Sequence, residues 1–220
     1  MGPTARARLS RRARARSAAE GGFTLVELLV VLFILLIVVT SLASVLVSAT
    51  HTEVDANKRF QAQEQARTGL DLLRRELHCA SAVTQTSGSP LVAGTAYSAI
   101  TASLPSTCPT NVTQAATFYV TWCTSASTLT TGDFALYRVT STSTQPTCAS
   151  PGTVKRADYL TTSTPFCLPS SATACSGVLK PPSSLPLLHV TMPVNVNGPA
   201  STVDTYNIVD DIALRNGAHT

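Results

Sequence analysis

Charged and aromatic residues are scarce in this chain of 220 residues, at 13% and 5% of the sequence. So few charges exclude a highly charged disordered chain and a long solvent-exposed coiled coil. The sequence also lacks a phosphate-binding loop, a G-x-S-x-G nucleophile motif, a dinucleotide fingerprint and zinc-type cysteine spacing. Asp204, Asp210 and Asp211 lack the regular ligand spacing of a calcium loop. We therefore expect no enzymatic activity, no cofactor and no metal site.

The basic residues of the chain are unevenly distributed. Six of its 16 basic residues are arginines within the first 16 positions. Without residues 1–22 the chain holds 10 basic and 11 acidic residues, a net charge of −1. The basic excess therefore belongs to the N-terminal segment, and the remainder argues against nucleic-acid binding through bulk charge. Lys155 and Arg156 are the candidate for a local cationic patch.

A long apolar segment follows the arginines. Residues Leu28 to Val39 are all apolar, and no Asp, Glu, Lys or Arg occurs from Leu28 to Thr52. About 20 such residues, each rising ~1.5 Å along a helix, cross the hydrocarbon core of a bilayer. Arginines that flank such a segment stay in the cytoplasm. The pattern predicts a single-pass membrane segment with the N-terminus inside the cell and the rest of the chain outside the cytoplasm.

An ordinary cleaved signal sequence is the alternative interpretation of this segment. Small residues at 47–49 could serve a signal peptidase, whereas the Arg11-Arg12 pair lacks the apolar pair of a twin-arginine signal. A lipoprotein signal is excluded because no cysteine precedes Cys79. Glu27 argues against a secretory signal, since a carboxylate near the membrane centre costs roughly 2.5–3.5 kcal/mol. We therefore expect a retained membrane anchor.

The residues before the apolar run resemble a known processing motif. The stretch Gly21-Gly22-Phe23-Thr24-Leu25-Val26-Glu27-Leu28-Leu29-Val30 is similar to the prepilin-type cleavage and methylation motif of type IV pilins and type II secretion pseudopilins. The resemblance implies that residues 1–22 are a leader, that prepilin peptidase cuts between Gly22 and Phe23, and that Phe23 is N-methylated. It also implies as partners the other pilins and minor pilins of a filament and an inner-membrane assembly platform.

The resemblance gives Glu27 a role in filament assembly. After the cut Glu27 would be the fifth residue, one helical turn from a new α-amino group, whose ordinary pKa is about 7.7–8.0. In the filament this carboxylate is expected to meet the amine of a neighbouring subunit. Opposite charges in a medium of low dielectric constant favour one axial register. The alternative is a carboxylate that reaches the membrane edge without a partner.

The periodicity beyond the apolar run predicts one long helix. No proline occurs between Phe23 and Ser89. Apolar residues repeat at i, i+4, i+7, i+11 and i+14, which gives a single apolar stripe. We predict a helix from about Thr24 to about Ala82, with its membrane half at 23–52 and its amphipathic half at 53–83. The stripe consists of Ala66, Leu70, Leu73, Leu77 and Ala80.

Short β-rich runs then alternate with clusters of Pro, Gly, Ser and Thr. Phe118, Val120 and Trp122 fall on one face at period two and are expected to pack on the helix stripe. Pro165 to Pro186 is interpreted as a loop. The predicted fold is α+β: a long N-terminal helix packed on the antiparallel sheet of a β-rich, pilin-like extracytoplasmic body at 84–220. The expected strands are Ala99–Leu104, Ala116–Thr124, Phe134–Thr140, Leu187–Met192 and part of Thr205–Arg215.

A finer resemblance lies in the body. Gly69 to Leu77, Leu136-Tyr137-Arg138 and Asp211 to Asn216 are similar to segments of J-type minor pseudopilins and W-type minor pilins. The resemblance implies a minor subunit that initiates or caps a type IV pilus or a type II secretion pseudopilus at the cell surface. A pilus-displayed adhesin or a DNA-capture module stays open as the alternative function.

Six cysteines lie beyond the membrane segment, and their even number suits an oxidising compartment with up to three disulfides. Cys167 and Cys175 are close enough to close a small loop and are the preferred pair. The other four admit three pairings, which the sequence leaves open. A catalytic Cys–His pair with His78, His189 or His219 has no spacing that fixes its geometry. The six are Cys79, Cys108, Cys123, Cys148, Cys167 and Cys175.

Overall fold

The computed structural model describes residues 22–129, 131–170, 175, 185–201 and 205–215. These residues form one long helix and nine strands. They fall into two compact units, and the boundary along the chain lies between Glu53 and Val54. The elements are α2 (Leu25–Cys79), β1 (Ala82–Thr84), β2 (Thr95–Tyr97), β3 (Ala99–Leu104), β4 (Phe118–Ala126), β5 (Phe134–Ser141), β6 (Val154–Leu160), β7 (Phe166–Leu168), β8 (Leu187–Val194) and β9 (Tyr206–Ala213).

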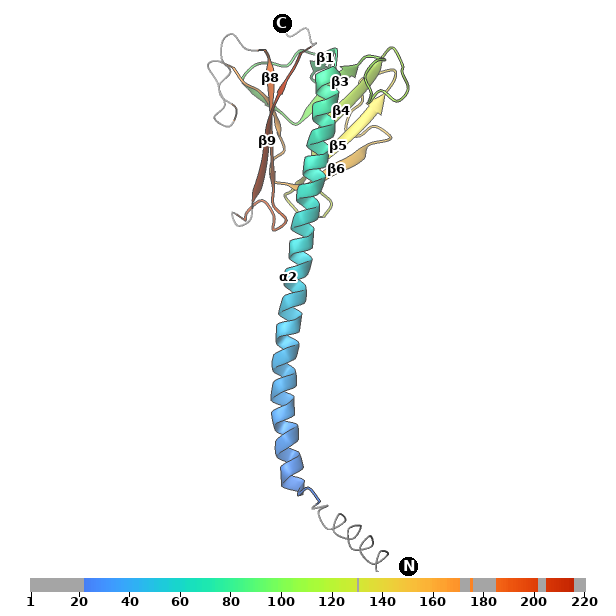
Figure 1. Ribbon diagram of the computed structural model, residues 1–220. Coiled ribbons are helices and arrows are strands. Elements are labelled where there is room, and N and C mark those ends of the chain that lie inside the picture. The colour runs from blue at the N-terminus through green and yellow to red at the C-terminus, as the bar shows by residue number, and fades with distance from the viewer. Residues whose placement is uncertain (1–21, 130, 171–174, 176–184, 202–204, 216–220) are drawn as a thin grey trace, which may run out of the picture. The chain divides into compact units, whose positions relative to one another are not determined.

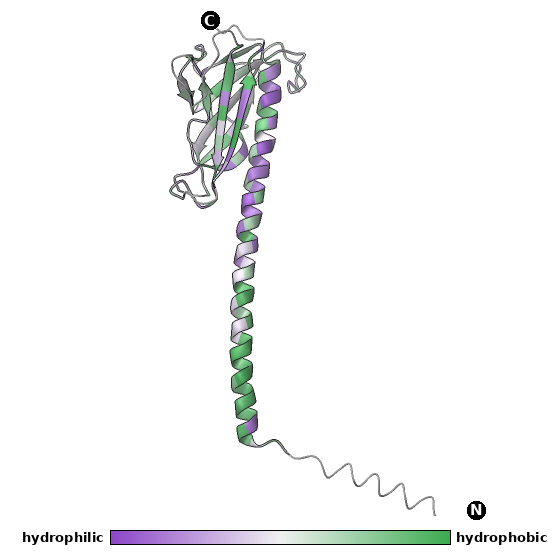
Figure 2. Ribbon diagram, turned by 60° about the vertical axis from the view of Figure 1, so that its left-hand side comes forward, coloured by the Kyte–Doolittle hydropathy of each residue, from purple (hydrophilic) through white to green (hydrophobic). Residues whose placement is uncertain are grey.

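The N-terminal unit holds the apolar half of α2. Every described residue from Gly22 to Glu53 is exposed, and the colouring of Figure 2 changes from apolar to polar along the helix. Hydroxyl side chains inside the apolar stretch donate to the helix's own carbonyls, as Thr40 Oγ1 does to Leu36 O at 2.7 Å. Because these polar groups are satisfied locally, they do not oppose burial in lipid. Among the described residues, α2 is the helix long and apolar enough to cross a membrane.

The second unit, from Val54 onward, packs the rest of α2 against the sheet. The predicted stripe is buried: Leu70 has 6% of its surface exposed and its other members have 2% or less. The buried set of this helical face also includes Ala62, Gly69 and Glu76. The helix with an apolar stripe packed on an antiparallel sheet confirms the predicted α+β fold.

The sheet is antiparallel throughout and curls around this part of the helix. Its strand order is β1-β3-β4-β5-β6-β8-β7-β2, and β9 pairs with β8. β6 and β8 are joined only by the pair Leu160↔Val194. In Figure 1, β3 to β6 lie on one side of the body half of α2, and β8 and β9 lie on the other. The single-pair junction therefore marks the place where the sheet bends.

β4 is buried on both of its faces. Phe118, Val120 and Trp122 face the core as predicted, with 3% or less of each side chain exposed. Thr121 on the opposite face is also fully buried, and its hydroxyl is satisfied there by donating to Pro146 O at 2.8 Å in the segment after β5. The alternation in the sequence indicated only the helix-facing half of this arrangement.

The five expected strands form as β3, β4, β5, β8 and β9, whereas β1, β2, β6 and β7 were not predicted. β1, β2 and β7 are only three residues long. β6 carries three charged residues and has irregular register against β5, so its apolar residues do not alternate. Interpreting Pro165 to Pro186 as a loop was wrong for Phe166–Leu168; residues 171–174 and 176–184 of it lie outside the described residues.

Candidate functional site

The predicted cleavage point lies just before the helix. Gly22 and Phe23 are exposed and not helical, and α2 begins at Leu25. The first helical hydrogen bond runs from Leu28 N to Thr24 O at 3.2 Å. A peptidase could therefore bind the chain at Gly22–Phe23 without unwinding α2, and exposed irregular segments are the usual sites of proteolysis. The leader predicted at 1–22 lies outside the described residues except for Gly22.

Thr24 and Glu27 form a capping box at the N-terminus of α2. Thr24 Oγ1 accepts from Glu27 N at 3.3 Å, and Glu27 Oε2 accepts from Thr24 N at 3.4 Å. Such reciprocal bonds satisfy two of the amide groups left open at a helix start. The sequence signal for this feature is Thr-x-x-Glu before an apolar run, from which a capping box was not predicted.

The capping box turns the Glu27 carboxylate toward the cleavage point. Its contacts are exposed and long, at 3.3–3.4 Å, so they are weak hydrogen bonds. Cutting before Phe23 would create an α-amino group one residue from Thr24. The negative carboxylate also stabilises the helix start, because the N-terminal end of the helix dipole is positive. Glu27 thus stabilises the helix start while its oxygens remain accessible to a cation.

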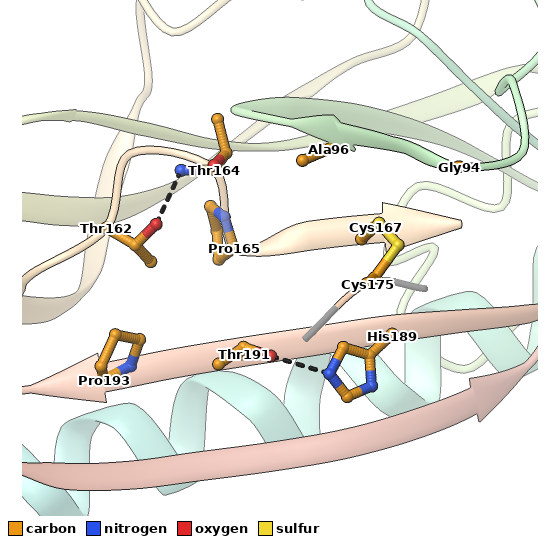
Figure 3. Close-up of a pocket in the computed structure, with 10 residues that line it drawn as sticks. All are labelled: Gly94, Ala96, Thr162, Thr164, Pro165, Cys167, Cys175, His189, Thr191 and Pro193. Carbon is orange, nitrogen blue, oxygen red and sulfur yellow. Dashed lines mark hydrogen bonds between the residues drawn. A yellow bond between two sulfur atoms is a disulfide. The ribbon is translucent and has the colours of Figure 1, made fainter. Parts of the chain in front are cut away.

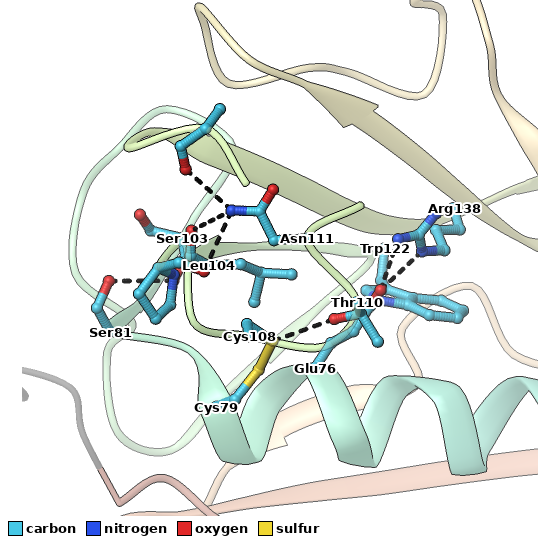
Figure 4. The surroundings of a disulfide bond; sticks show 12 residues. Glu76, Cys79, Ser81, Ser103, Leu104, Cys108, Thr110, Asn111, Trp122 and Arg138 are labelled. Atoms are coloured by element: carbon cyan, nitrogen blue, oxygen red, sulfur yellow. Dashed lines mark hydrogen bonds and ion pairs between the residues drawn. A yellow bond between two sulfur atoms is a disulfide. The ribbon is translucent and has the colours of Figure 1, made fainter. Parts of the chain in front are cut away.

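A buried carboxylate ties the helix to the sheet in the body. Glu76 is 0% exposed and accepts from Trp122 Nε1 at 2.6 Å and from Arg138 Nη2 at 2.6 Å (Figure 4). Trp122 and Arg138 are direct cross-strand neighbours on β4 and β5. The role of Glu76 was not predicted from the sequence. Two signals indicate it: Glu76 lies three residues after Leu73 of the stripe, and a buried tryptophan needs a partner for its N–H group.

Two arginines of α2 contact side chains of β9. Arg67 lies over the ring of Tyr206, with 5.3 Å between Cζ and the ring centroid, and also donates to its hydroxyl. Arg74 lies two turns further along and pairs with Asp210, with 2.8 Å between Nη2 and Oδ2. Asp210, which was considered as a calcium ligand, is therefore an ion-pair partner. Asp204 lies outside the described residues.

Asp158 lies at a shift of register between β5 and β6. It has 2% of its side chain exposed and contacts Lys155 Nζ at 2.6 Å and Ser127 Oγ at 2.7 Å. The next residue, Tyr159, adopts φ of 60° and donates its N–H to the same carboxylate at 2.9 Å. Burial alone raises the pKa of Asp158, but the hydrogen bonds from Lys155, Ser127 and the Tyr159 amide together lower it below its usual value.

The two residues of the candidate cationic patch, Lys155 and Arg156, line a shallow cavity beside α2 together with Glu64. Lys155 is held by Asp158, and this hydrogen bond raises the pKa of the Lys155 ammonium despite partial burial. Arg156 lies beside α2: its Cβ is 3.6 Å from the point that a Cβ would occupy if Gly69 were replaced by a larger residue. Lys155 is therefore paired within the body although its side chain is exposed, and Arg156 is half-buried.

All six cysteines form disulfides: Cys79–Cys108, Cys123–Cys148 and Cys167–Cys175. The last is the pair that the sequence favoured, and the first joins the end of α2 to the loop before β4 (Figure 4). With no free cysteine among the described residues, a catalytic Cys–His pair has no thiol. His219 lies outside the described residues.

Comparison with known families identifies one matching segment. A family model described as the prokaryotic N-terminal methylation motif matches residues 17–43. The match spans the cleavage point, the capping box and the first turns of the apolar helix, and it supports a type IV pilin or pseudopilin that is processed by prepilin peptidase. Comparisons with curated proteins and with solved structures find no match.

Proposed function

We propose that this chain is a membrane-anchored minor pilin or pseudopilin, a structural subunit of a type IV pilus or a type II secretion pseudopilus. Prepilin peptidase cuts it between Gly22 and Phe23 and methylates the new N-terminus at Phe23. The observation that carries the proposal is the methylation motif matched at 17–43, which ends inside an exposed apolar helix. That helix continues into a folded body, as an anchored filament subunit requires.

The proposed topology places the leader in the cytoplasm and the body outside it. Six arginines precede the apolar segment, and positive residues stay on the cytoplasmic side. Three disulfides in the body suit an oxidising extracytoplasmic compartment. The membrane half of α2 then holds the processed subunit until the assembly platform moves it into the filament.

Glu27 is proposed to set the axial register during assembly. An apolar helix surface packs almost equally well one turn higher or lower, so it fixes no register by itself. An unpaired carboxylate and an unpaired α-amino group are each costly in lipid. They neutralise each other at only one axial offset between neighbouring subunits. The weak capping contacts of Glu27 leave its carboxylate available for this pairing.

A minor role, at the start or cap of the filament, rests on the body's resemblance to J-type pseudopilins and W-type pilins. Two of the resembling segments, Gly69 to Leu77 and Leu136 to Arg138, meet in the ion pair of Glu76 with Arg138. A displayed adhesin is the second candidate, favoured by a cavity on the outer face of the body. DNA capture draws no support from Lys155, because its charge is already paired with Asp158.

Variants of Gly22 in cells test the proposal. Gly22→Ala should be processed nearly as the unaltered chain is, whereas Gly22→Leu should retain the leader, because a bulky side chain keeps the backbone away from the peptidase's carboxylates. The processed chain should appear in sheared filaments and the unprocessed chain should not. Normal cutting of Gly22→Leu, or equal amounts of both variants in filaments, would contradict the proposed processing.

A further inference from the structure

A cavity of about 460 Å³ opens on the outer face of the body (Figure 3). β8 alternates between Leu188, Val190 and Met192 in the core and His189 and Thr191 on the opposite face. The loop before β7 forms the facing wall with Thr162 and Thr164. The volume falls within the range of about 300–1,000 Å³ that small-molecule sites occupy.

The residues that line this cavity are polar but almost free of charge. Hydroxyl groups come from Thr162, Thr164 and Thr191, and the rings of Pro165 and Pro193 provide apolar surface. Asp, Glu, Lys and Arg are absent from the described lining, and His189 is its only titratable side chain. Among these described residues a ligand with a full charge finds no Asp, Glu, Lys or Arg side chain to pair with, so no ion pair offsets its desolvation.

Three residues form a hydrogen-bonded chain on the β8 wall. His189 is 2% exposed, and its Nδ1 lies 2.6 Å from Asp211 Oδ1. An ionised carboxylate only accepts, so Nδ1 carries the proton that it shares with Asp211. The Thr191 hydroxyl lies 2.9 Å from Nε2 and forms one hydrogen bond with it, as donor or as acceptor, so at least one lone pair of the Thr191 oxygen stays unused in either case. What Thr191 offers the cavity is therefore a hydrogen-bond acceptor.

The facing wall offers the opposite polarity. Thr162 Oγ1 accepts from Thr164 N at 3.3 Å, which leaves the Thr162 hydroxyl proton available to the cavity. A carboxylate has no proton for Thr191, and an ammonium group has no lone pair for Thr162. A hydroxyl group supplies both. We propose that this cavity binds a small neutral polyhydroxyl ligand of the monosaccharide or disaccharide class, oriented by Thr191 and Thr162.

Saturation-transfer NMR on the full chain tests this proposal. The detergent must be zwitterionic and without a sugar headgroup, because an alkyl glycoside would occupy the site. The probes are glucose, galactose, mannose, N-acetylglucosamine and maltose, with glucuronate and glucosamine as charged relatives. We expect at least one neutral sugar to bind and both charged relatives to bind at least about tenfold more weakly, the effect of 1.4 kcal/mol.

Variants assign the binding to the cavity. Thr191→Val and Thr162→Val should each weaken binding at least about tenfold, whereas Thr191→Ser retains the hydroxyl and should bind normally. Thr107→Val is the matched control, because it makes the same chemical change at an exposed site before Cys108. Unaltered fluorescence of the single tryptophan, Trp122, verifies folding of each variant. Absence of neutral-sugar binding, equal binding of the charged relatives, or binding that survives both valine variants would overturn the proposal.

Discussion

Removing Arg138 should destabilise the body far more than removing the whole ion pair. Arg138→Met leaves the fully buried Glu76 carboxylate with Trp122 as its remaining partner in this network. Breaking a buried pair from one side costs about 3–5 kcal/mol, because an uncompensated charge stays in the core. In a unit of this size that loss lowers Tm by about 6–20 °C.

The double variant Glu76→Met/Arg138→Met removes both charges and fills their volume with apolar atoms. Replacements of this kind are often neutral or stabilising. The indole N–H of Trp122 then lacks its acceptor, which costs about 1–3 kcal/mol. We therefore expect the double variant to be more stable than Arg138→Met alone, and Trp122→Phe added to the double variant to recover part of the remaining loss.

The assay is thermal and urea unfolding of the full chain in detergent, followed by circular dichroism for every variant and by fluorescence for the variants that retain Trp122. Trp122 is the only tryptophan and lies in the network itself, so its emission reports on this junction. The reasoning is refuted if the effects of Glu76→Met and Arg138→Met simply add in the double variant. Additive losses would mean that the two charges do not stabilise each other.

Three further changes test other contacts. Asp158→Asn should destabilise the body at neutral pH, because the pKa of Asp158 is lowered from 3.8 in the folded state and the carboxylate therefore stabilises the fold above pH 3.8. This contribution disappears as the pH falls through the lowered pKa, so the variant and the unaltered chain should become equally stable in urea unfolding at that acidic pH. Replacing Cys79 and Cys108 by Ala should cost about 3–4 kcal/mol, as expected for a closed loop with a sequence separation of 29, and the unaltered chain should show few free thiols in a thiol assay. Glu27→Val should leave cleavage and body stability intact but reduce the subunit in sheared filaments, and unreduced incorporation would exclude the register role; Thr24→Ala is the control that removes the capping box and retains the carboxylate.

Periodicity predicted the parts of the fold that depend on regular patterns. The stripe from Ala66 to Ala80 and the alternation of Phe118, Val120 and Trp122 identified the helix, one central strand and the faces that meet. β6 was missed because its charged residues and irregular register remove the alternation. β7 was missed because three residues next to Pro165 give no periodic signal.

The candidate sites could be predicted only where their residues are close together in the sequence. The N-terminal motif is contiguous in sequence, so its residues could be named directly. The capping box at Thr24 and Glu27 was equally local and could have been found. The partners of Glu76 come from two strands far along the chain, and the cavity around Thr191 combines several segments. Contacts of that kind depend on strand register, which local patterns do not specify here.

The mass of the mature N-terminal peptide, measured on chain purified from cells that contain prepilin peptidase, tests the central claim most directly. The account predicts a chain that begins at Phe23 and carries one methyl group on its α-amino nitrogen. The same chain from cells without the peptidase should retain the leader. A mature N-terminus at Ala49 or Thr50, or an intact leader in the presence of active peptidase, would contradict the account.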